Sequence, residues 1–350
     1  MKKLFLVATA IVLAGCSSQT ANPQPSDSPG GTVTVIAHDS FVMTDQQIND
    51  FKAATGITIE LIQAGDAGTM VSSAILTAGS PSADVMFGID NTLSAKAVNS
   101  GVFEPYESQA SGTFKSEFQN LTAGGHLTPV DFGDVCVNFD KKFFAANSLA
   151  VPTSLADLTS KQYSGLLVTQ DPGTSSPGLA FLLATIATFS DEWPTYWEQL
   201  RANNVKVAGS WSDAYFSDFT AGGGNGAYPL VVSYATSPAA EAVYAETELS
   251  EVGTGSMTAG CFRQIEFAGI LRGSDNVAAS KLVVDFLVSK EFQSSVAESM
   301  FVYPVRQDVA LPDAFTRFAA EVRSPLSLPS EVIDVNLDAW LTAWDAVMKN

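Results

Sequence analysis

Short apolar runs that alternate with amphipathic stretches are the feature that most constrains the fold of this chain. Residues 32–38 (TVTVIAH) and 57–64 (ITIELIQA) are typical of strands, and the stretch between them, 46–54, has its apolar residues at helical spacing. Residues 83–89 (ADVMFGI) are almost wholly apolar, as in a strand buried on both faces of a parallel sheet. This β-α-β order predicts an α/β lobe whose ligand-binding loops lie at the carboxyl ends of its strands.

A second group of alternating elements follows from about residue 130. Its predicted strands are 135–139, 166–168, 205–208 and 230–234, and its predicted helices are 179–189 and 215–219. An extended segment at 261–270 (CFRQIEFAGI) is long enough to run back between two lobes. Because about 320 residues exceed what one core usually supports, we predict two α/β lobes with a hinge between them.

The lobe boundaries follow from the positions of these strands. Since the chain leaves the first lobe and later returns to it, that lobe is discontinuous. The predicted units are residues 32–132 with 266–310 for the first lobe, 133–265 for the second lobe, and 311–350 as C-terminal helices that pack on the second lobe.

The N-terminus has the order of a secretion signal with a lipid-attachment site. Two lysines precede an apolar run that ends in LAGC, with the cysteine at position 16. Such a run is shorter than the roughly 20 residues that span a bilayer. We therefore predict a signal peptide over 1–15, acylation of Cys16 with palmitate, and a Ser, Pro and Gly-rich tether over 16–31. The protein is expected outside the cytoplasm, lipid-anchored to the cell membrane, at the cell surface or in the periplasm.

The remaining two cysteines point to a disulfide. With Cys16 acylated, Cys136 and Cys261 remain as a pair in an oxidising compartment, where a disulfide persists. The alternative is two buried free thiols. The arithmetic, which leaves no odd thiol, favours the bridge.

Composition and motifs exclude several classes of function. The chain has 18 basic and 37 acidic residues, so its net charge of −19 repels nucleic acid. Two isolated histidines, His38 and His126, do not make a histidine-rich metal site, and the common hydrolase, metalloprotease and nucleotide-binding motifs are missing. We therefore predict no catalytic residues, no metal and no cofactor. A carboxylate pair of the glycosidase type stays open, although nothing marks one out.

The stretch 170–179 (QDPGTSSPGL) is predicted to be a strand-to-helix turn that can hold an anion. Pro172 and Gly173 end the strand, the following hydroxyl residues suit a helix cap, and Pro177 suits the first helical turn. Free N–H groups at a helix start attract phosphate or carboxylate. An ordinary capped helix start is the alternative.

Rings and acids gather on predicted loops. The stretches WSDAY at 211–215, SYATSP at 233–238 and FVYP at 301–304 combine aromatic with small polar side chains, which suits a flat organic ligand. Together with Asp39, Asp66 and Asp90 at strand ends, they predict a pocket for an aromatic cation, held by stacking, cation–π contact and carboxylates. Taken singly, each loop is equally a surface loop with one ring in the core.

At these residues the chain resembles the thiamine-binding proteins of ABC importers, within the two-lobed iron, polyamine and thiamine type of solute-binding proteins. The resemblance covers nearly everything after the tether. It implies the type II periplasmic-binding-protein fold, with a hinge between two α/β lobes. The matching segments are DSF at 39–41, ADVMFGIDN at 83–91, PVDFG at 129–133, QDPGTSSPGL at 170–179, WSDAY at 211–215, SYATSPA at 233–239, YPV at 303–305 and the C-terminal PSEV…AWLTAW.

The resemblance also implies roles for individual residues. Ser175, Ser176 and Trp211 would bind the phosphate end of phosphorylated thiamine. Two rings, Tyr234 and Phe301, would flank the ring system of the ligand. The ligand-binding set that follows is His38, Asp39, Asp66, Asp90, Ser175, Ser176, Trp211, Tyr215, Tyr234 and Phe301.

Asp39 and Asp66 would then lie near the cationic or aminopyrimidine end of thiamine. The sequence departs from the family pattern at two positions, since His38 stands where the family has tyrosine and Phe301 where it has tryptophan. Phe is a weaker cation–π partner than Trp, and His can carry charge, so affinity or the preferred phosphorylation state is expected to differ.

The function implied is a monomeric extracytoplasmic lipoprotein that captures thiamine, thiamine monophosphate or thiamine diphosphate and delivers it to an ABC permease. Closure of two lobes around the ligand would be its mechanical step. Two alternatives remain at this point: an Fe(III) or polyamine receptor of the same fold, and an anchored hydrolase.

Overall fold

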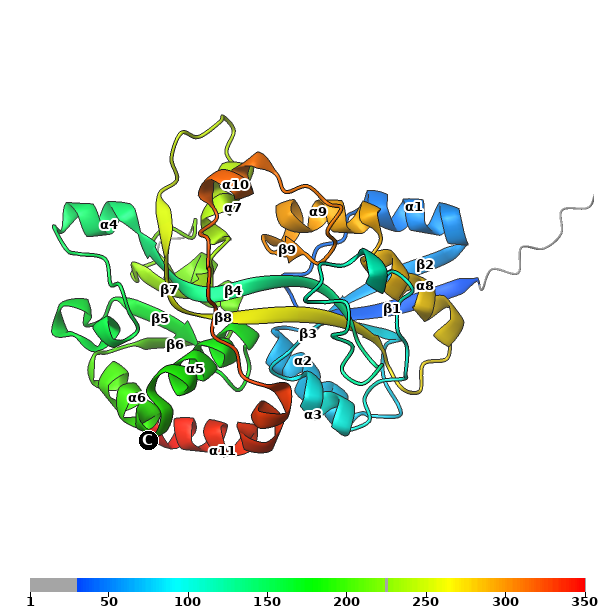
Figure 1. Cartoon of the computed structure of the whole chain (residues 1–350), viewed down its shortest axis with the longest axis horizontal. Helices are drawn as coiled ribbons and strands as arrows, with labels where there is room; N and C mark the ends of the chain where they lie inside the picture. Colours follow the sequence, from blue (N-terminus) through cyan, green and yellow to red (C-terminus); the bar gives the residue numbers. More distant parts are fainter. Residues whose placement is uncertain (1–29, 224–225, 350) are drawn as a thin grey trace, which may run out of the picture.

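The computed structural model describes residues 30–223 and 226–349, so the predicted signal peptide, Cys16 and nearly all of the predicted tether lie outside the described residues. One mixed sheet runs through this part of the chain, in the order β2-β1-β3-β8-β4-β7-β5-β6, and β9 pairs with β4 (Figure 1). The strands are β1 (Gly31–Ala37), β2 (Ile57–Gln63), β3 (Val85–Asp90), β4 (Thr128–Asp140), β5 (Leu167–Gln170), β6 (Lys206–Ala208), β7 (Leu230–Tyr234), β8 (Thr254–Ile270) and β9 (Tyr303–Pro304).

The first half of the molecule is built on the parallel strands β1, β2 and β3. All six residues of β3 are buried, which explains why this run has almost no polar residue before its end. Thr44 and Gln47 form a capping box that fixes where α1 begins. The helices of this half are α1 (Asp45–Thr55), α2 (Ala67–Leu76), α3 (Ser94–Asn99), α8 (Val277–Leu287) and α9 (Lys290–Met300).

The second half is built on β5, β6 and β7, of which β7 coincides with its predicted range. The helix predicted at 215–219 is a π-helical turn over residues 213–218, and residues 156–159 form a 3₁₀ turn. π-turns are rare and often occur at functional sites. The helices of this half are α4 (Lys141–Ala146), α5 (Ser176–Phe189), α6 (Trp193–Ala202) and α7 (Ser237–Val243).

Two long antiparallel strands, β4 and β8, belong to both halves and connect them (Figure 1). β8 pairs with β3 in the first half, whereas the later part of β4 pairs with β7 in the second. Where they cross, Asp134 on β4 lies opposite Arg263 on β8, with 2.5 Å between Oδ1 and Nε. The returning segment predicted at 261–270 is therefore real but starts earlier, at Thr254. The predicted α/β class is confirmed.

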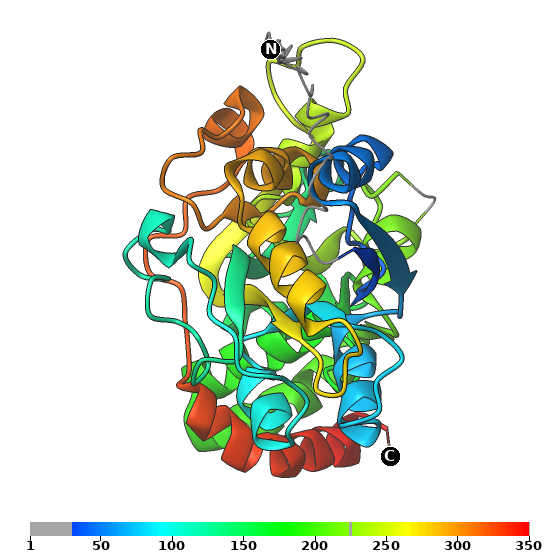
Figure 2. The ribbon, with the colours of Figure 1, turned by 90° about the vertical axis from the view of Figure 1, so that its right-hand side faces the viewer.

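The C-terminal helices contact both halves. The short helix α10 (Asp313–Phe318) packs on α7, whereas α11 (Ser330–Met348) packs on α6 and also on α3 (Figures 1 and 2). On the α6 side, the rings of Trp344 and Trp197 meet edge to face at 5.5 Å. On the α3 side, Lys96 Nζ lies 2.5 Å from Asp338 Oδ1. The prediction that residues 311–350 pack on the second lobe therefore omits the contact of α11 with α3.

A row of three carboxyl groups crosses the middle of the sheet. Asp90 on β3 and Asp131 on β4 each lie opposite Glu266 on β8, so the three side chains share one face. Asp90 and Asp131 are fully buried, and both Asp131 oxygens are without a hydrogen-bond partner among the described residues. Burial, followed by the neighbouring Glu266, raises the pKa of Asp131 well above its usual range. Asp90 and Asp131 therefore retain protons that exposed aspartates lose.

The predicted disulfide is confirmed, since Cys136 and Cys261 are bonded with 4.4 Å between their Cα atoms. Both are buried, and they lie where the β4–β8 ladder is interrupted, between the pairs Val135–Phe262 and Val137–Met257. The covalent bond thus joins the two crossing strands at the point where backbone hydrogen bonds do not.

No helix in residues 30–223 and 226–349 has the length and apolarity to cross a membrane.

Removing the disulfide should destabilise the fold. The bridge closes a loop of 125 residues, for which chain entropy predicts up to about 4.7 kcal/mol. We expect Cys136→Ala with Cys261→Ala to lower the free energy of unfolding by roughly 2 to 4 kcal/mol, measured by urea titration of a form that lacks Cys16. Dithiothreitol should lower the midpoint of the parent protein and leave that of the double variant unchanged. If the parent protein without reductant and the double variant unfold at the same urea concentration, the disulfide does not stabilise the fold.

The carboxyl row should make stability fall as pH rises. Burial raises the pKa of Asp90 to about 7, whereas an aspartate in an unfolded chain titrates near 3.9. Between these values the folded protein holds a proton that the unfolded chain has lost, so stability falls across roughly pH 4 to 7. Asp90→Asn keeps the acceptor for the Thr92 N–H and should raise Tm at pH 8 more than at pH 5, by about 3 °C or more. Asp191→Asn, at an exposed carboxyl group, is the control, and a pH-independent effect of Asp90→Asn would refute this assignment.

Candidate ligand-binding site

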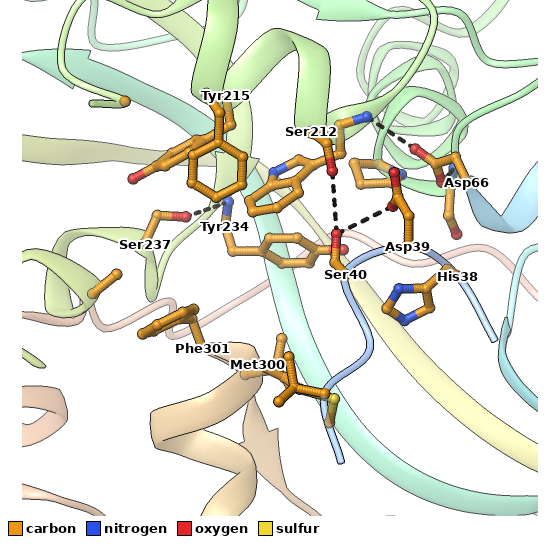
Figure 3. Close-up of a pocket in the computed structure, with 18 of the residues that line it drawn as sticks. His38, Asp39, Ser40, Asp66, Ser212, Tyr215, Tyr234, Ser237, Met300 and Phe301 are labelled. Carbon is orange, nitrogen blue, oxygen red and sulfur yellow. Dashed lines mark hydrogen bonds between the residues drawn. The ribbon is translucent and has the colours of Figure 1, made fainter. Parts of the chain in front are cut away.

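A cavity of about 460 Å³ opens between the two halves, beside the crossing strands (Figure 3). Its wall comes from the loop after β1, the starts of α2 and α5, the π-helical turn, the end of β7, α7, β8 and the end of α9. Sites for small organic ligands usually measure roughly 300 to 1,000 Å³ and lie at such lobe interfaces. The cavity therefore has the size and position of a small-molecule site.

Three rings form one wall of the cavity. Trp211 and Tyr215 stack at 5.1 Å with 16° between their planes, and Tyr234 meets Trp211 at 6.3 Å and 61°. The π-helical turn sets the spacing that brings Trp211 and Tyr215 together, while Trp211 Nε1 donates to Ser233 Oγ at 2.9 Å. Tyr234 lies over Gly133, where a Cβ atom would approach Tyr234 Cδ1 to 2.8 Å. These contacts hold the rings in place for stacking with a ligand.

Phe301 lines the opposite side, at the end of α9 (Figure 3). It has a left-handed backbone (φ 58°), which is unfavourable for a residue with a side chain. Its ring meets Tyr244 edge to face at 5.2 Å, and Tyr244 is 71% exposed. Phe301 and Tyr244 thus form the outer edge of the cavity.

Asp66 joins the two halves at the start of α5. One carboxylate oxygen accepts hydrogen bonds from Ala67 N at 2.7 Å and Ser176 N at 3.2 Å, and the other accepts from Trp211 N at 2.9 Å (Figure 3). Burial raises the pKa of Asp66, although the N–H donors, that of Trp211 foremost, act in the opposite direction. The Ser176 Oγ atom is buried without a partner in the described residues, and the buried Ser175 hydroxyl also lowers the pKa of Asp66. Sequence reasoning placed Asp66 near a ligand cation, whereas the structure places it at the predicted phosphate turn.

His38 lies between the cavity and the carboxyl row. Its Nε2 is 3.4 Å from Glu266 Oε2, and Tyr234 Oη donates to Gln264 Oε1 at 3.3 Å beside it. Burial alone lowers the pKa of His38, but the carboxylates around it, Glu266 foremost, outweigh burial and raise that pKa. The ring lies against Gly88 (φ 91°), where any Cβ atom would overlap it. His38 can therefore carry a positive charge in this cavity, which a tyrosine at the same position could not.

Acidic side chains outnumber basic ones on the cavity wall. Among the described residues that line it there is no lysine or arginine, and the basic group present is His38. Four carboxyl groups line the same wall, namely Asp39, Asp66, Glu241 and Glu266. Such a wall attracts a cationic ligand and repels an anionic one, except where N–H and hydroxyl donors converge. In the part of the chain described, no group of three or more His, Cys, Asp or Glu side chains is placed so that it could hold a metal ion.

Most of the predicted ligand residues meet in this cavity. Those that line it are His38, Asp39, Asp66, Ser176, Trp211, Tyr215, Tyr234 and Phe301. Ser175 lies just behind Ser176, and Asp90 lies deeper in the sheet, where it accepts from Thr92 N at 2.7 Å. Sequence reasoning missed Gln264 and Glu266, which also line the cavity. Their polar side chains within the mostly apolar segment 261–270 were a usable signal.

The chain is similar to known bacterial solute-binding proteins. The family model of bacterial extracellular solute-binding proteins matches residues 80–319. The thiamine-binding periplasmic protein of Escherichia coli (strain K12) is 28% identical over 320 residues, which cover 89% of this chain and 92% of that protein. The thiamine-binding periplasmic protein of Salmonella typhimurium (strain LT2) is 27% identical over 319 residues, with the same two coverages of 89% and 92%.

The solved structure of a periplasmic thiamin binding protein superposes with a TM-score of 0.80 at 24% identity, covering 91% of this chain and 96% of that one. The predicted two-lobed periplasmic-binding-protein fold is thereby confirmed. The family is one of extracytoplasmic receptors that bind solutes for transport, not of enzymes, and its model spans more than half of the sequence. The chain belongs to the bacterial extracellular solute-binding proteins.

Proposed function

We propose that this protein captures thiamine and its phosphate esters outside the cytoplasm and delivers them to the permease of an ABC importer. The observation that carries the proposal is a cavity in which stacked rings face carboxyl groups, without lysine or arginine among the residues that line it. A thiazolium ion attached to a flat aminopyrimidine needs both features. The names of the similar proteins from Escherichia coli and Salmonella typhimurium support the same ligand.

The proposed pose follows from the positions of the rings and charges. Tyr234 and Phe301, on opposite sides of the cavity, would flank the ligand rings, with Trp211 and Tyr215 extending the aromatic wall (Figure 3). Cation–π contact contributes on the order of 0.5 to 2 kcal/mol per ring. Asp39 and Glu266 would offset the thiazolium charge. The side chain of the thiazolium would point toward Ser176 at the start of α5.

The alternatives from the sequence lose support at this cavity. A polyamine would use the carboxyl groups but has no need of four rings, and its flexible chain would gain little from stacking. Ferric iron needs a set of oxygen or nitrogen ligands, and no three His, Cys, Asp or Glu side chains among the described residues are placed to hold a metal ion. An organic cation with a flat ring uses every group on the wall.

We also propose that Cys16 carries the lipid that anchors the protein to the membrane, with the signal peptide over 1–15 removed and 16–31 acting as a tether. The apolar run and the LAGC box support this proposal. A tethered monomer would keep the cavity outside the cytoplasm and close to the permease. The pairing of Cys136 with Cys261 fits an oxidising compartment and leaves Cys16 for acylation.

Calorimetry tests the ligand directly. A ligand-stripped form starting after the tether should bind thiamine with sub-micromolar affinity, and Tyr234→Ala should weaken binding about tenfold or more, because a ring contact is lost. Tyr244→Ala, at the exposed outer edge, is the matched control and should change affinity less than about threefold. Spermidine and ferric citrate test the two alternatives. Tight binding of either one, with no heat from thiamine or its monophosphate, would refute the proposal.

Cell fractionation tests the anchor. The full chain should appear in the membrane fraction and incorporate labelled palmitate, because an acylated cysteine adds about 0.8 kcal/mol of membrane affinity per buried CH₂. Cys16→Ser should release the protein to the soluble fraction with thiamine affinity unchanged. Palmitate labelling that persists in Cys16→Ser would place the lipid elsewhere, and a soluble full chain would disprove the anchor.

A further inference from the structure

The anion position at the start of α5 is filled by the protein's own carboxylate. Asp66, from the first half, accepts hydrogen bonds from Ser176 N and Trp211 N of the second half, at 3.2 and 2.9 Å. Ser176 N is the first N–H group of the 14-residue helix α5, and Trp211 N, from the segment after β6, points at the same carboxylate, so a bound anion would use both groups. Asp66 is only 9% exposed and lines the cavity. The site for a ligand anion and the site for Asp66 therefore overlap.

Two buried hydroxyl groups mark the same turn as able to hold more than Asp66. The Ser176 hydroxyl is nearly fully buried and has no hydrogen-bond partner among the described residues, and the Ser175 hydroxyl is fully buried and its interaction with Asp66 lowers the pKa of that carboxyl group. Buried hydroxyls are normally paired, so the Ser176 hydroxyl is free to donate to an anion with several oxygens, and the Ser175 hydroxyl could turn from Asp66 to the same anion. Ser176 also lines the cavity. A phosphate monoester is the anion whose oxygen count matches two N–H groups and two hydroxyls.

The backbone keeps Asp66 close to this turn. Thr69 N donates to Thr174 O at 3.2 Å, and a Cβ atom on Gly68 would approach Thr174 O to 2.6 Å. The start of α2 is thus held directly against the loop before α5. A ligand phosphate that reaches the turn would meet the Asp66 carboxylate at hydrogen-bonding distance, where two negative charges repel strongly.

We propose that Asp66 determines which terminal group of the ligand this site prefers. A phosphate ester binds only when a proton is taken up from solvent and shared between the phosphate and Asp66. The uncharged hydroxyethyl end of thiamine binds without proton uptake. This inference rests on the proposed function. Affinity for thiamine monophosphate relative to thiamine therefore falls as pH rises. Replacing Asp66 by a neutral side chain removes the competition and favours the ester.

Other titratable groups face Asp66 and must be separated from its effect. His38 from the end of β1 and Tyr234 from β7 both interact electrostatically with it, and Asp39 and Glu266 line the same cavity. These groups also face the ring system that thiamine and its monophosphate share. They therefore act on both affinities, whereas the phosphate of the ester itself titrates at about pH 6, so the contribution of Asp66 is read as the difference between the parent and Asp66→Asn. The terminal group differs between the ligands, and Asp66 is the carboxylate at that end.

The experiment measures the dissociation constants of thiamine and thiamine monophosphate by calorimetry from pH 5.5 to 8.0. In the parent protein the ratio of monophosphate to thiamine should rise with pH, and titration in two buffers of different ionisation enthalpy should report proton uptake for the ester alone. Asp66→Asn should lower that ratio at pH 8 about tenfold or more and reduce the proton uptake. Asp39→Asn removes a carboxyl group from the same cavity but not from the turn, and should leave both quantities unchanged.

Three outcomes overturn the proposal: an unchanged ratio in Asp66→Asn, no proton uptake with the ester, or equal effects of Asp39→Asn. Asp66→Ser keeps a side-chain cap for α2 and replaces Asp66→Asn if thermal unfolding shows that the latter is not folded. Inorganic phosphate, titrated against Trp211 fluorescence, reads the turn independently of thiamine. If Asp66→Asn binds phosphate more tightly than the parent at pH 8, the role of Asp66 is supported even if thiamine does not bind. Absence of thiamine binding would refute only the proposed function. Equal phosphate binding by the two proteins would overturn the role of Asp66.

Discussion

The pairing of β4 with β8 is the interaction on which the rest of this structure depends. Both strands cross from one half to the other, and the strands on each side attach to them. Backbone hydrogen bonds, the ion pair of Asp134 with Arg263 and the disulfide of Cys136 with Cys261 all act along this one crossing. The cavity lies beside it, so the distance between the two halves at the cavity follows from how these strands bend.

Two of the charged groups in the cavity have partners within the protein. His38 stands beside Glu266, and Asp66 stands against the N–H groups at the start of α5. Each pair brings together groups from segments that are far apart in the sequence. A ligand with a cationic ring and an anionic tail would exchange partners with both pairs, so its net gain is smaller than the direct contacts imply. Selectivity then depends on which internal pair is easier to separate.

Strands and helices that are marked by a local residue pattern could be predicted from the sequence. Segments that become strands only through pairing with distant residues could not. Strand 230–234 and the helix after the turn at 170–179 could be located because apolar spacing and turn residues mark them directly. The polar start of β8 (TGSMTAG) is typical of a loop and becomes a strand because it pairs with β4. Most of the ligand residues predicted from the sequence line the cavity. Sequence reasoning did not reveal their depth, since Asp90 follows a strand as the others do but lies inside the sheet.

The contact between Gly88 and His38 has a consequence for how such a site can change during evolution. The imidazole fills the space that a Cβ atom at position 88 would need, and the left-handed backbone there independently favours glycine. Gly88 cannot be replaced first, because a side chain at position 88 fits only after the ring at position 38 has been replaced by something smaller or has turned away. A titratable group in the binding cavity therefore persists together with a glycine in a different strand, and the order in which mutations arise decides whether a descendant keeps it.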